Sequence, residues 1–537
     1  MTTGTTAPTK SPTIAASVTI AALMLFSMFF GAGNLIFPPM LGAEAGTSFA
    51  PAITGFLLAG VALPVISVIA VAITGNDIYD LAHRGGKIFG LMFPVLVYLA
   101  IGAFYALPRT AVVSFSTAVT PITGYDSTTA AVIFAAVYFA IALALAFDPS
   151  GLVDKLGKYL TPCLLALLVV LVVLSMVNLP GNPGEVSGVY TDHPMSAGLI
   201  KGYMTMDSLA ALAFGIMIVS SLRYKGVPNG PVLVRGVGAA AIIAGALLAV
   251  IYVGLGMIGQ KVDNPGAFPD GAALLTHAAQ TTMGTPGMIV FGLIVLLACL
   301  STAAGLIGAT SEFFHRIVPS VSYRTWAVVF ALISLGVSTL GLQQVLAIAG
   351  PIIGFLYPAA ITLVFLTLIE PVFRRKLYWA FRIALFVAVV WSALMTALSL
   401  DIAPGIISPI IDWSPAHEQD LGWVVPSLVG AAAGYVLDLV LRPVRAVPVG
   451  GEHQLEAELR GGHRDVEALE EAVLIEHPDR PGADGPDKLD QVDHRLAALH
   501  CERAEAKARL KALDEAISTA QSHHQSLSQS DSAPTEK

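Results

Sequence analysis

A carboxylate stands inside an otherwise apolar segment of the chain. Asp207, within Thr205-Met206-Asp207-Ser208, lies about ten residues into a stretch long enough to cross a bilayer. A charged residue at the bilayer midplane costs about 2.5–3.5 kcal/mol on insertion scales, so it usually serves a binding site or an ion pathway. The alternative is that Asp207 caps a broken half-helix or bonds a neighbouring span, and the two roles are compatible. Its type and position therefore indicate a site inside the membrane.

A second apolar segment contains residues that break helices. It reads Gly31-Ala32-Gly33-Asn34 and is followed by Pro38 and Pro39. Two glycines lower helix propensity by about 2 kcal/mol relative to alanine, and each proline removes an N–H donor. Lipid cannot satisfy the freed backbone groups, whereas a ligand or ion in an internal cavity can. Small residues also permit close helix packing, so the residues alone leave unwinding and packing both open.

Adjacent hydroxyls form a third candidate, Ser301-Thr302, in the middle of another apolar segment. Hydroxyl oxygens suit a small hard cation. In membrane helices, however, Ser and Thr also bond the carbonyl one turn back, and this reading stays open as well. One basic residue, Arg109 in Leu107-Pro108-Arg109-Thr110, lies at the outer end of its predicted span. We expect its side chain to snorkel to the membrane surface or to form an ion pair there.

The composition defines the elements that must position these residues. Of 537 residues, 55% are hydrophobic and 12% are charged, with a mean hydropathy of +0.74, whereas soluble chains are about a quarter charged. The apolar residues form blocks of roughly the 20 residues that a bilayer span requires. We therefore expect an all-α integral membrane protein. Its twelve predicted spans are 14–39, 48–74, 88–108, 129–147, 159–179, 198–222, 236–259, 287–311, 325–341, 345–369, 383–400 and 422–441.

The ninth and tenth spans are separated only by a polar turn. Residues 325–369 contain no charged residue, and as one helix they would extend about twice the roughly 30 Å of a hydrocarbon core. We expect the chain to turn at Gly341-Leu342-Gln343-Gln344. With the N-terminus in the cytoplasm, sixteen of the nineteen Lys and Arg residues up to position 445 fall on the cytoplasmic side. Both termini are therefore predicted to be cytoplasmic.

The first span carries the helix-breaking residues Gly31 to Asn34, and the sixth carries Asp207. The two spans cross the membrane in opposite directions, and the sixth follows the first by five spans. This is the arrangement of an inverted repeat, spans 1–5 against spans 6–10, in which the first helix of each half is discontinuous. In such proteins the half-helix N-termini face an anionic group of the substrate, and freed carbonyls coordinate a cation. The pattern predicts a transport site between the two interruptions.

The sequence FFGAGNLIFPP in span 1, ALPRTAVVSF in span 3 and GYMTMDSLAALAFG in span 6 resemble the bacterial branched-chain amino acid:cation symporters, the LIVCS or BrnQ-type family. The resemblance covers about residues 12–445. It implies the five-plus-five inverted-repeat fold of LeuT with two extra helices, within the amino acid–polyamine–organocation group. It also implies Na⁺-coupled uptake of leucine, isoleucine and valine across the bacterial cytoplasmic membrane.

The resemblance also implies site residues. Backbone groups of Gly31, Ala32 and Gly33 would meet the substrate carboxylate, and Asn34 would support a second cation or hold the unwound stretch. The segment Thr205, Met206, Asp207 and Ser208 would receive the ammonium. The carbonyls of Ser27, Phe30 and Ala298, with the hydroxyls of Ser301 and Thr302, would bind Na⁺.

Other function classes remain as alternatives. A proton-coupled carrier of the same or other neutral amino acids is the first, because Asp207 could exchange protons. A channel is disfavoured by deep breaks in two antiparallel helices, and an enzyme by the lack of a metal-ligand cluster, a nucleophile–base arrangement or a phosphate loop in the sequence. No cofactor beyond Na⁺ as coupling ion, and no nucleic acid partner, is expected.

The ends of the chain differ from the transporter domain predicted over 12–445. Residues 1–445 carry 19 Lys and Arg against 18 Asp and Glu, while 446–537 carry 10 against 19. We expect 1–11 and 521–537 to be disordered and 446–537 to form an acidic cytoplasmic tail. Heptad-spaced apolar residues within 452–520 indicate either a helical hairpin or coiled coil, with self-association, or a loosely ordered segment.

Overall fold

The computed structural model describes residues 14–74, 78–147, 161–179, 181, 183–228, 230–262, 265–373 and 377–441. Within these ranges the chain is helical and contains no strand. The expectations for residues 1–11, for the acidic tail 446–537 and for its segment 452–520 lie outside the described residues.

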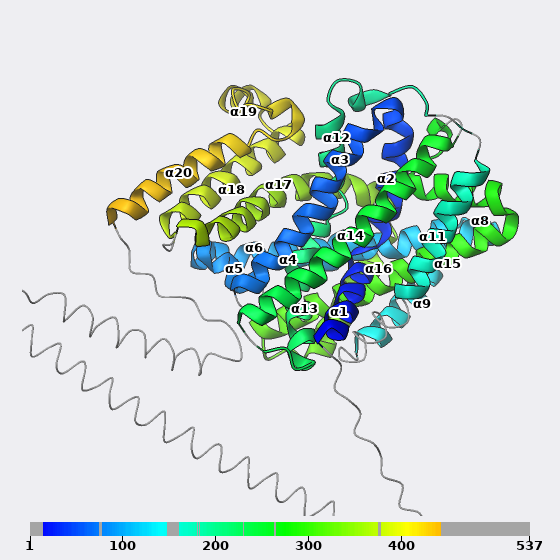
Figure 1. Cartoon of the computed structure of the whole chain (residues 1–537), viewed down its shortest axis with the longest axis horizontal. Coiled ribbons are helices and arrows are strands. Elements are labelled where there is room, and N and C mark those ends of the chain that lie inside the picture. The colour runs from blue at the N-terminus through cyan, green and yellow to red at the C-terminus, as the bar shows by residue number, and fades with distance from the viewer. Residues whose placement is uncertain are drawn as a thin grey trace, which may run out of the picture. The chain divides into compact units, whose positions relative to one another are not determined.

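The helices follow the order of the predicted spans (Figure 1). Ten helical stretches within the described ranges are long and apolar enough to cross a membrane, and Ile14–Phe29 and Tyr323–Ser338 are shorter apolar helices. The α-helices are α1 Ile14–Phe29, α2 Ala32–Ala45, α3 Phe49–Leu57, α4 Leu63–Thr74, α5 Ile78–Ala82, α6 Lys87–Leu99, α7 Ala106–Ser114, α8 Thr120–Thr123, α9 Thr128–Ala146, α11 Thr161–Asn178, α12 Pro194–Tyr203, α13 Asp207–Tyr224, α14 Pro231–Lys261, α15 Gly271–Ile317, α16 Tyr323–Ser338, α17 Leu342–Ile369, α18 Trp379–Ser399, α19 Pro404–Ile411 and α20 Val424–Leu441.

The predicted turn between the ninth and tenth spans is confirmed. α16 ends at Ser338 and α17 begins at Leu342, after Gly341 with a φ of 81°. The third span differs from its prediction over 88–108, because helical turns continue from Lys87 to Thr123. Two π-helical segments, Ala100–Phe104 and Phe115–Val119, widen the helix where it passes from α6 to α8. Arg109 therefore lies inside this span rather than at its outer end.

The two interrupted helix pairs are α1–α2 and α12–α13. Most residues of α1, α2 and α13 are buried, and α14 packs against both α1 and α2. Close approach depends on small residues. A Cβ on Gly259 of α14 would lie 1.9 Å from the carbonyl oxygen of Pro39, and a Cβ on Gly198 of α12 would lie 1.9 Å from that of Ala52. Only glycine allows these backbones to touch. In lipid, where no hydrophobic effect drives helices together, such close van der Waals packing stabilises helix contacts.

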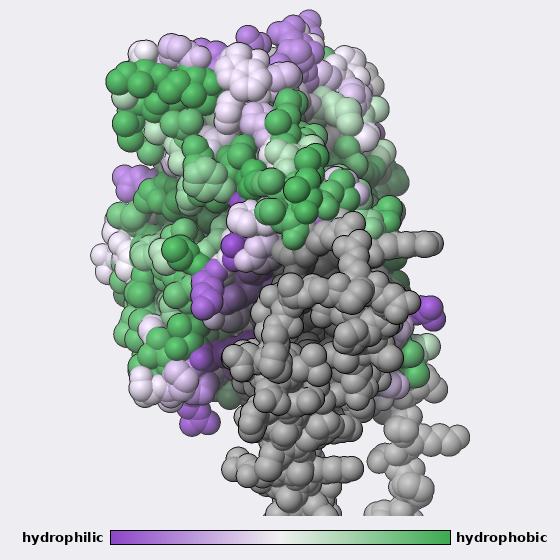
Figure 2. Space-filling view, turned by 90° about the vertical axis from the view of Figure 1, so that its left-hand side faces the viewer, coloured by the Kyte–Doolittle hydropathy of each residue, from purple (hydrophilic) through white to green (hydrophobic). Residues whose placement is uncertain are grey.

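Apolar side chains remain exposed on the outside of the helices. Figure 2 shows them spread over much of the face that carries α18 and α20, and Phe386, Val429 and Val440 are each at least 63% exposed. A water-soluble surface rarely exposes so large an apolar area, whereas a surface in contact with lipid does.

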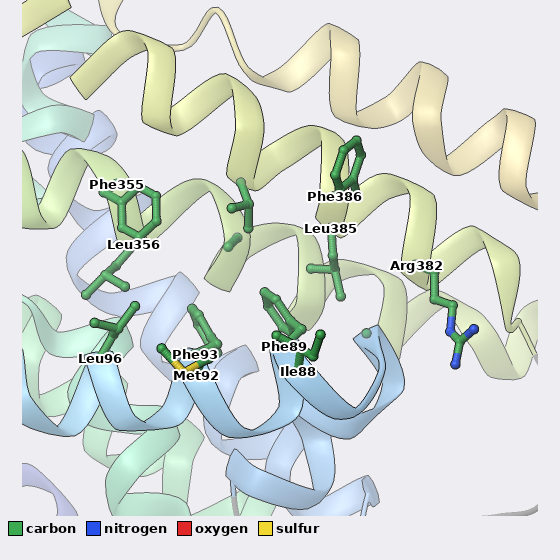
Figure 3. A pocket seen from close by; sticks show the side chains of 13 residues that line it. Ile88, Phe89, Met92, Phe93, Leu96, Phe355, Leu356, Arg382, Leu385 and Phe386 are labelled. Atoms are coloured by element: carbon green, nitrogen blue, oxygen red, sulfur yellow. The ribbon is translucent and has the colours of Figure 1, made fainter. Parts of the chain in front are cut away.

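A groove of about 350 Å³ opens between α6, α17 and α18. Ile88, Phe89, Phe355 and Phe386 are among the apolar residues that line it, and Arg382 lies at one end (Figure 3). None of its lining residues comes from the interrupted helices. The groove is therefore distinct from the site that the sequence predicts.

Candidate functional site

The first interruption lies at Phe30 and Gly31. α1 ends at Phe29, and Gly31 adopts an extended conformation with φ −125° and ψ −157° before α2 begins at Ala32. The side chain of Asn34 folds back, and its Oδ1 accepts a hydrogen bond of 3.2 Å from the Gly31 amide. The backbone therefore leaves the helix within the predicted motif, and Asn34 satisfies one of the freed donors.

The second interruption covers Met204 to Met206. α12 ends at Tyr203 and α13 begins at Asp207, with Met206 between them in the left-handed region at φ 63°. A methionine rarely adopts this conformation, so the surrounding structure must impose it. The Thr205 hydroxyl donates to the Gly202 carbonyl at 2.8 Å. Asp207 is consequently the first residue of α13, where the positive end of the helix dipole favours its carboxylate.

The two interruptions meet through the Asp207 side chain. Asn34 Nδ2 donates to Asp207 Oδ2 at 2.7 Å, and the Tyr252 hydroxyl donates to the same oxygen at 2.9 Å. Asn34 Nδ2 also contacts the Tyr252 hydroxyl. All three side chains are buried. Tyr252, from α14, thus completes a polar cluster that joins the N-terminal ends of α2 and α13.

Arg109 is also part of this region, which corrects the expectation that it snorkels or pairs at the outer end of its span. Its side chain is buried, with 4% exposed. Nη1 donates to the Met204 carbonyl and Nη2 to the Thr205 carbonyl, both at 3.2 Å, and Nη1 contacts the Tyr105 hydroxyl. The guanidinium therefore holds the carbonyls at the C-terminal end of α12, which the interruption leaves without helical partners.

These residues surround one small cavity. About 20 Å³ of it is open to the centre of a water molecule, which is room for about one ordered water. It is lined by Met28, Phe29, Gly31, Ala32, Asn34, Ala106, Arg109, Thr110, Thr205, Met206, Asp207, Ala210, Thr302 and Leu306. Opposite charges from Arg109 and Asp207 and mainly apolar side chains therefore face the same enclosed space.

Two of the predicted substrate residues take other positions. Gly33 lies against the Arg109 side chain, since a Cβ there would come within 2.7 Å of Nη2. The Ser208 hydroxyl donates to the Ala59 carbonyl at 3.3 Å. The other six predicted residues, from Gly31 to Asp207, all line the cavity.

A second group of oxygens lies between α1 and α15. Ser301 Oγ is 2.9 Å from the Ser27 carbonyl oxygen and 2.8 Å from that of Ala298. Thr302 Oγ1 is 3.1 Å from the Met28 carbonyl oxygen and 3.5 Å from that of Ser27.

The carbonyls of Ser27 and Met28 belong to the last turn of α1, where the helix dipole favours a cation. Four of the five predicted ion-site residues are thus brought together. The fifth, Phe30, stacks its ring on Phe26 at 5.5 Å and on Tyr252 at 6.5 Å, and its carbonyl makes none of these contacts.

The oxygen group contains only neutral ligands. Within the described residues no three His, Cys, Asp or Glu side chains gather as a metal site would require. Hydroxyl and carbonyl oxygens suit a hard cation of low charge. Thr302 belongs both to this group and to the cavity lining, so the two sites share a residue.

The sequence analysis did not identify three residues that contribute to the cavity region or to the oxygen group. Tyr252 and Tyr105 lie in apolar helices, and nothing in their local sequence distinguishes them from packing residues. Met28 contributes its backbone carbonyl to the oxygen group, which any residue at that position would supply. Arg109 carried the one available signal, because a charged residue between two apolar stretches is costly unless it is bonded inside the protein.

Comparisons with known proteins agree on one family. A sequence profile described as "Branched-chain amino acid transport protein" matches residues 14–441. The branched-chain amino acid permease BrnQ of Corynebacterium glutamicum is 55% identical over 422 residues, which cover 79% of this chain and 95% of the relative. The permease BraB of Bacillus subtilis is 36% identical over 429 residues, which cover 79% and 96%.

Among solved structures, the nucleobase–cation symporter Mhp1 in a closed conformation matches with a TM-score of 0.54 and 17% identity. The match covers 81% of this chain and 96% of Mhp1. At this identity the likeness concerns the fold alone, which is that of an all-helical membrane transporter.

Proposed function

The chain belongs to the branched-chain amino acid transport protein family, and from this premise we propose that it takes up leucine, isoleucine and valine by Na⁺-coupled symport. Members of this family are transporters and not enzymes. Uptake would proceed across the bacterial cytoplasmic membrane by alternating access, with both termini in the cytoplasm, as the distribution of basic residues favours.

The observation that carries the proposal is the contact between the two helix interruptions around one cavity. Asp207 would pair with the substrate ammonium, and the backbone of the Gly31–Asn34 stretch, at the N-terminus of α2, would face the carboxylate. Phe29, Ala210 and Leu306 give the cavity an apolar wall for an alkyl side chain. Because one methylene is worth only about 1–3 kcal/mol in a pocket, broad specificity for branched-chain side chains is expected.

Na⁺ would bind among the carbonyls of Ser27 and Ala298 and the hydroxyls of Ser301 and Thr302. The Met28 carbonyl joins this proposed ligand set, and the Phe30 carbonyl stays in it from the sequence prediction. The hydroxyl oxygens of Ser301 and Thr302 lie at hydrogen-bonding distance from the carbonyl oxygens of Ser27, Ala298 and Met28. A bound cation would replace those hydrogen bonds and tie α1 to α15. Since Thr302 also lines the cavity, the ion would influence the substrate site directly, which is what coupling requires.

The architecture we propose has twelve spans with a five-plus-five inverted repeat. α1–α2 would form span 1 and α12–α13 span 6, each discontinuous, with α18 and α20 as the two extra spans. The cavity has room for about one water molecule and is too small for the side chain of a bound leucine. Substrate binding therefore requires the interrupted helices to move apart, which supports an alternating-access cycle. The tail 446–537 would lie in the cytoplasm and could mediate self-association.

Uptake of radiolabelled leucine into proteoliposomes tests the function and the coupling together. An inward Na⁺ gradient at equal pH should drive accumulation, and gramicidin, which dissipates the gradient, should abolish it. No accumulation under any imposed gradient would overturn the transport proposal. Equilibration without concentration would fit a channel or an uncoupled carrier, and saturable counterflow of leucine would separate these two.

Proton coupling remains the second candidate, favoured by the burial of Asp207 beside the Tyr252 hydroxyl. In that case an inward proton gradient without Na⁺ should drive leucine uptake, and a protonophore should abolish it even when Na⁺ is present. Na⁺-driven uptake that survives the protonophore excludes this candidate.

A further inference from the structure

We propose that Arg109 is the residue that recognises the substrate carboxylate. The inference rests on the proposed function, because it assigns a ligand group to a side chain of the same cavity. It adds a charged partner to a subsite that otherwise consists of backbone amides.

The donors of Arg109 leave one edge of the guanidinium available. Arginine carries five N–H groups in a planar fork. The Nη1 hydrogens are used by the Tyr105 hydroxyl and the Met204 carbonyl, and one Nη2 hydrogen by the Thr205 carbonyl. The buried Nε has no hydrogen-bond partner among the described residues. Nε–H lies on the same edge of the guanidinium as one of the two Nη2 hydrogens, and this edge binds a carboxylate with two parallel hydrogen bonds.

The charge distribution around the cavity points to a zwitterion. A buried arginine is costly unless its charge is compensated. Asp207 lines the same cavity, yet no ion pair within the described part of the chain joins the two residues. Asp207 is instead held by Asn34 and Tyr252, and Arg109 by backbone carbonyls. Two opposite charges are thus kept apart, and an α-amino acid carries a carboxylate and an ammonium that can meet both.

Gly33 fixes the guanidinium next to the first interruption. A Cβ at this position would lie 2.7 Å from Nη2 and 3.0 Å from Cζ of Arg109. The 2.7 Å contact is shorter than real Cβ atoms show, so a side chain at position 33 would make the guanidinium shift, whereas glycine allows it to lie against α2 near its N-terminus. A carboxylate bound by Arg109 would therefore also be close to the amides of the Gly31–Asn34 stretch.

Competition between leucine and leucinamide tests the assignment, because leucinamide keeps the ammonium and side chain but lacks the carboxylate. Below about pH 7 both are protonated at the amine. The measurement is inhibition of radiolabelled leucine uptake, together with thermal stabilisation of the purified protein by each compound, which does not require transport. The full-length protein should prefer leucine by about 10–100-fold, the range expected for hydrogen bonds to charged groups.

In Arg109→Gln this preference should fall to within about threefold, because leucine loses affinity and leucinamide does not. Arg109→Lys keeps the charge but loses the fork and should give an intermediate ratio. Gly33→Ala should lower the ratio by displacing the guanidinium. Arg382→Gln, a change to a basic residue in the groove between α6, α17 and α18, is the matched control and should leave the ratio unchanged.

A ratio that stays at its original value in Arg109→Gln, or in Arg109→Lys if the glutamine variant does not fold, overturns the assignment. Equal losses for leucine and leucinamide would also overturn it, since they indicate a structural role. If the unaltered protein takes up leucine and the Arg109 substitutions leave the preference for leucine over leucinamide unchanged, the proposed function stands without this inference. If the unaltered protein neither binds nor transports leucine, both fall.

Discussion

Asn34 and Asp207 are separated by 173 positions in the chain, yet Asn34 Nδ2 lies 2.7 Å from Asp207 Oδ2. The same Asn34 side chain accepts a hydrogen bond from the Gly31 amide. One amide group therefore stabilises the first interruption from within and ties it to the second. Any movement that separates the two half-helices must break or rearrange this contact.

Asn34→Ala should weaken both folding and transport. The substitution leaves the buried Asp207 carboxylate without one donor and the Gly31 amide without its acceptor, at a cost of about 1.5–3 kcal/mol for the charged partner. We expect a lower thermal unfolding temperature in detergent and a leucine uptake rate reduced by tenfold or more.

Tyr252→Phe is the matched comparison for Asn34→Ala, because it removes one hydroxyl donor to the same carboxylate oxygen and keeps the ring. It should lower stability less than Asn34→Ala does. An Asn34→Ala protein with unchanged unfolding temperature and uptake would contradict the role of this contact.

The paired substitution Ser301→Ala and Thr302→Ala should raise the Na⁺ concentration for half-maximal leucine uptake by about tenfold or more. Each change removes one hydroxyl ligand of the proposed ion site, and a single hydrogen bond or ligand to a charged group is worth about 1.5–3 kcal/mol. The measurement is initial uptake rate against Na⁺ concentration at saturating leucine.

Ser311→Ala provides the control for that pair. Ser311 lies on the same helix, and its hydroxyl bonds the Ile307 carbonyl at 2.6 Å, away from α1. It should leave the Na⁺ dependence unchanged. An unaltered Na⁺ dependence in the paired variant would remove α15 from the ion site.

The local sequence predicted where the two helices are interrupted, but not which side chains form hydrogen bonds with the residues there. Gly31, Gly33 and Asn34 disfavour a regular helix through their own backbone and side-chain preferences, so their effect is visible in a short segment. Arg109 and Tyr252 act through helices that reach the cavity only when the bundle is packed. Their register depends on π-helical turns and on glycine contacts between distant helices, and neither property follows from hydrophobic periodicity. The same limit explains why Arg109 was expected at the outer end of its span.

Asp438 shows that an acidic residue in a membrane helix does not by itself mark a transport site. It lies in α20, and its buried carboxylate accepts hydrogen bonds from the backbone amides of Tyr378, Trp379 and Ala380 at 2.8–3.0 Å. It therefore caps the start of α18 from a neighbouring helix. Both are acidic residues within predicted spans, Asp207 about ten residues into 198–222 and Asp438 near the end of 422–441. The packed structure shows that the first lines a cavity and the second caps a helix.

Asp438→Ala should destabilise the protein without changing substrate recognition. Loss of the cap leaves three amides at the start of α18 without this acceptor, and losing a helix N-cap costs about 0.5–2 kcal/mol. We expect a lower unfolding temperature, with the leucine concentration for half-maximal uptake and the leucine-to-leucinamide ratio unchanged. Asp401→Asn, at an exposed position after α18, should alter neither property. A change in leucine affinity on Asp438→Ala would show that this end of the molecule takes part in the transport site.

Gly31→Ala should affect the ion and the substrate together, because position 31 lies where the two proposed sites meet. A Cβ at Gly31 would come within 2.8 Å of Thr302 Oγ1 and 3.1 Å of Thr302 Cγ2. The φ of −125° suits alanine, so the effect would arise from the clash and not from backbone strain. Displacing Thr302 moves a hydroxyl of the oxygen group and a wall of the cavity at once. We therefore expect half-maximal concentrations of Na⁺ and of leucine to rise by similar factors.

The control for Gly31→Ala is Gly350→Ala in α17, where a Cβ would meet no atom within 4 Å. It should leave both concentrations unchanged and can slightly favour the helix. If Gly31→Ala raised the half-maximal leucine concentration at every Na⁺ concentration but left the Na⁺ dependence as it was, the two sites would not be joined through Thr302. Coupling would then have to pass through the movement of α1 relative to α15, a path that does not require the two ligands to share a residue.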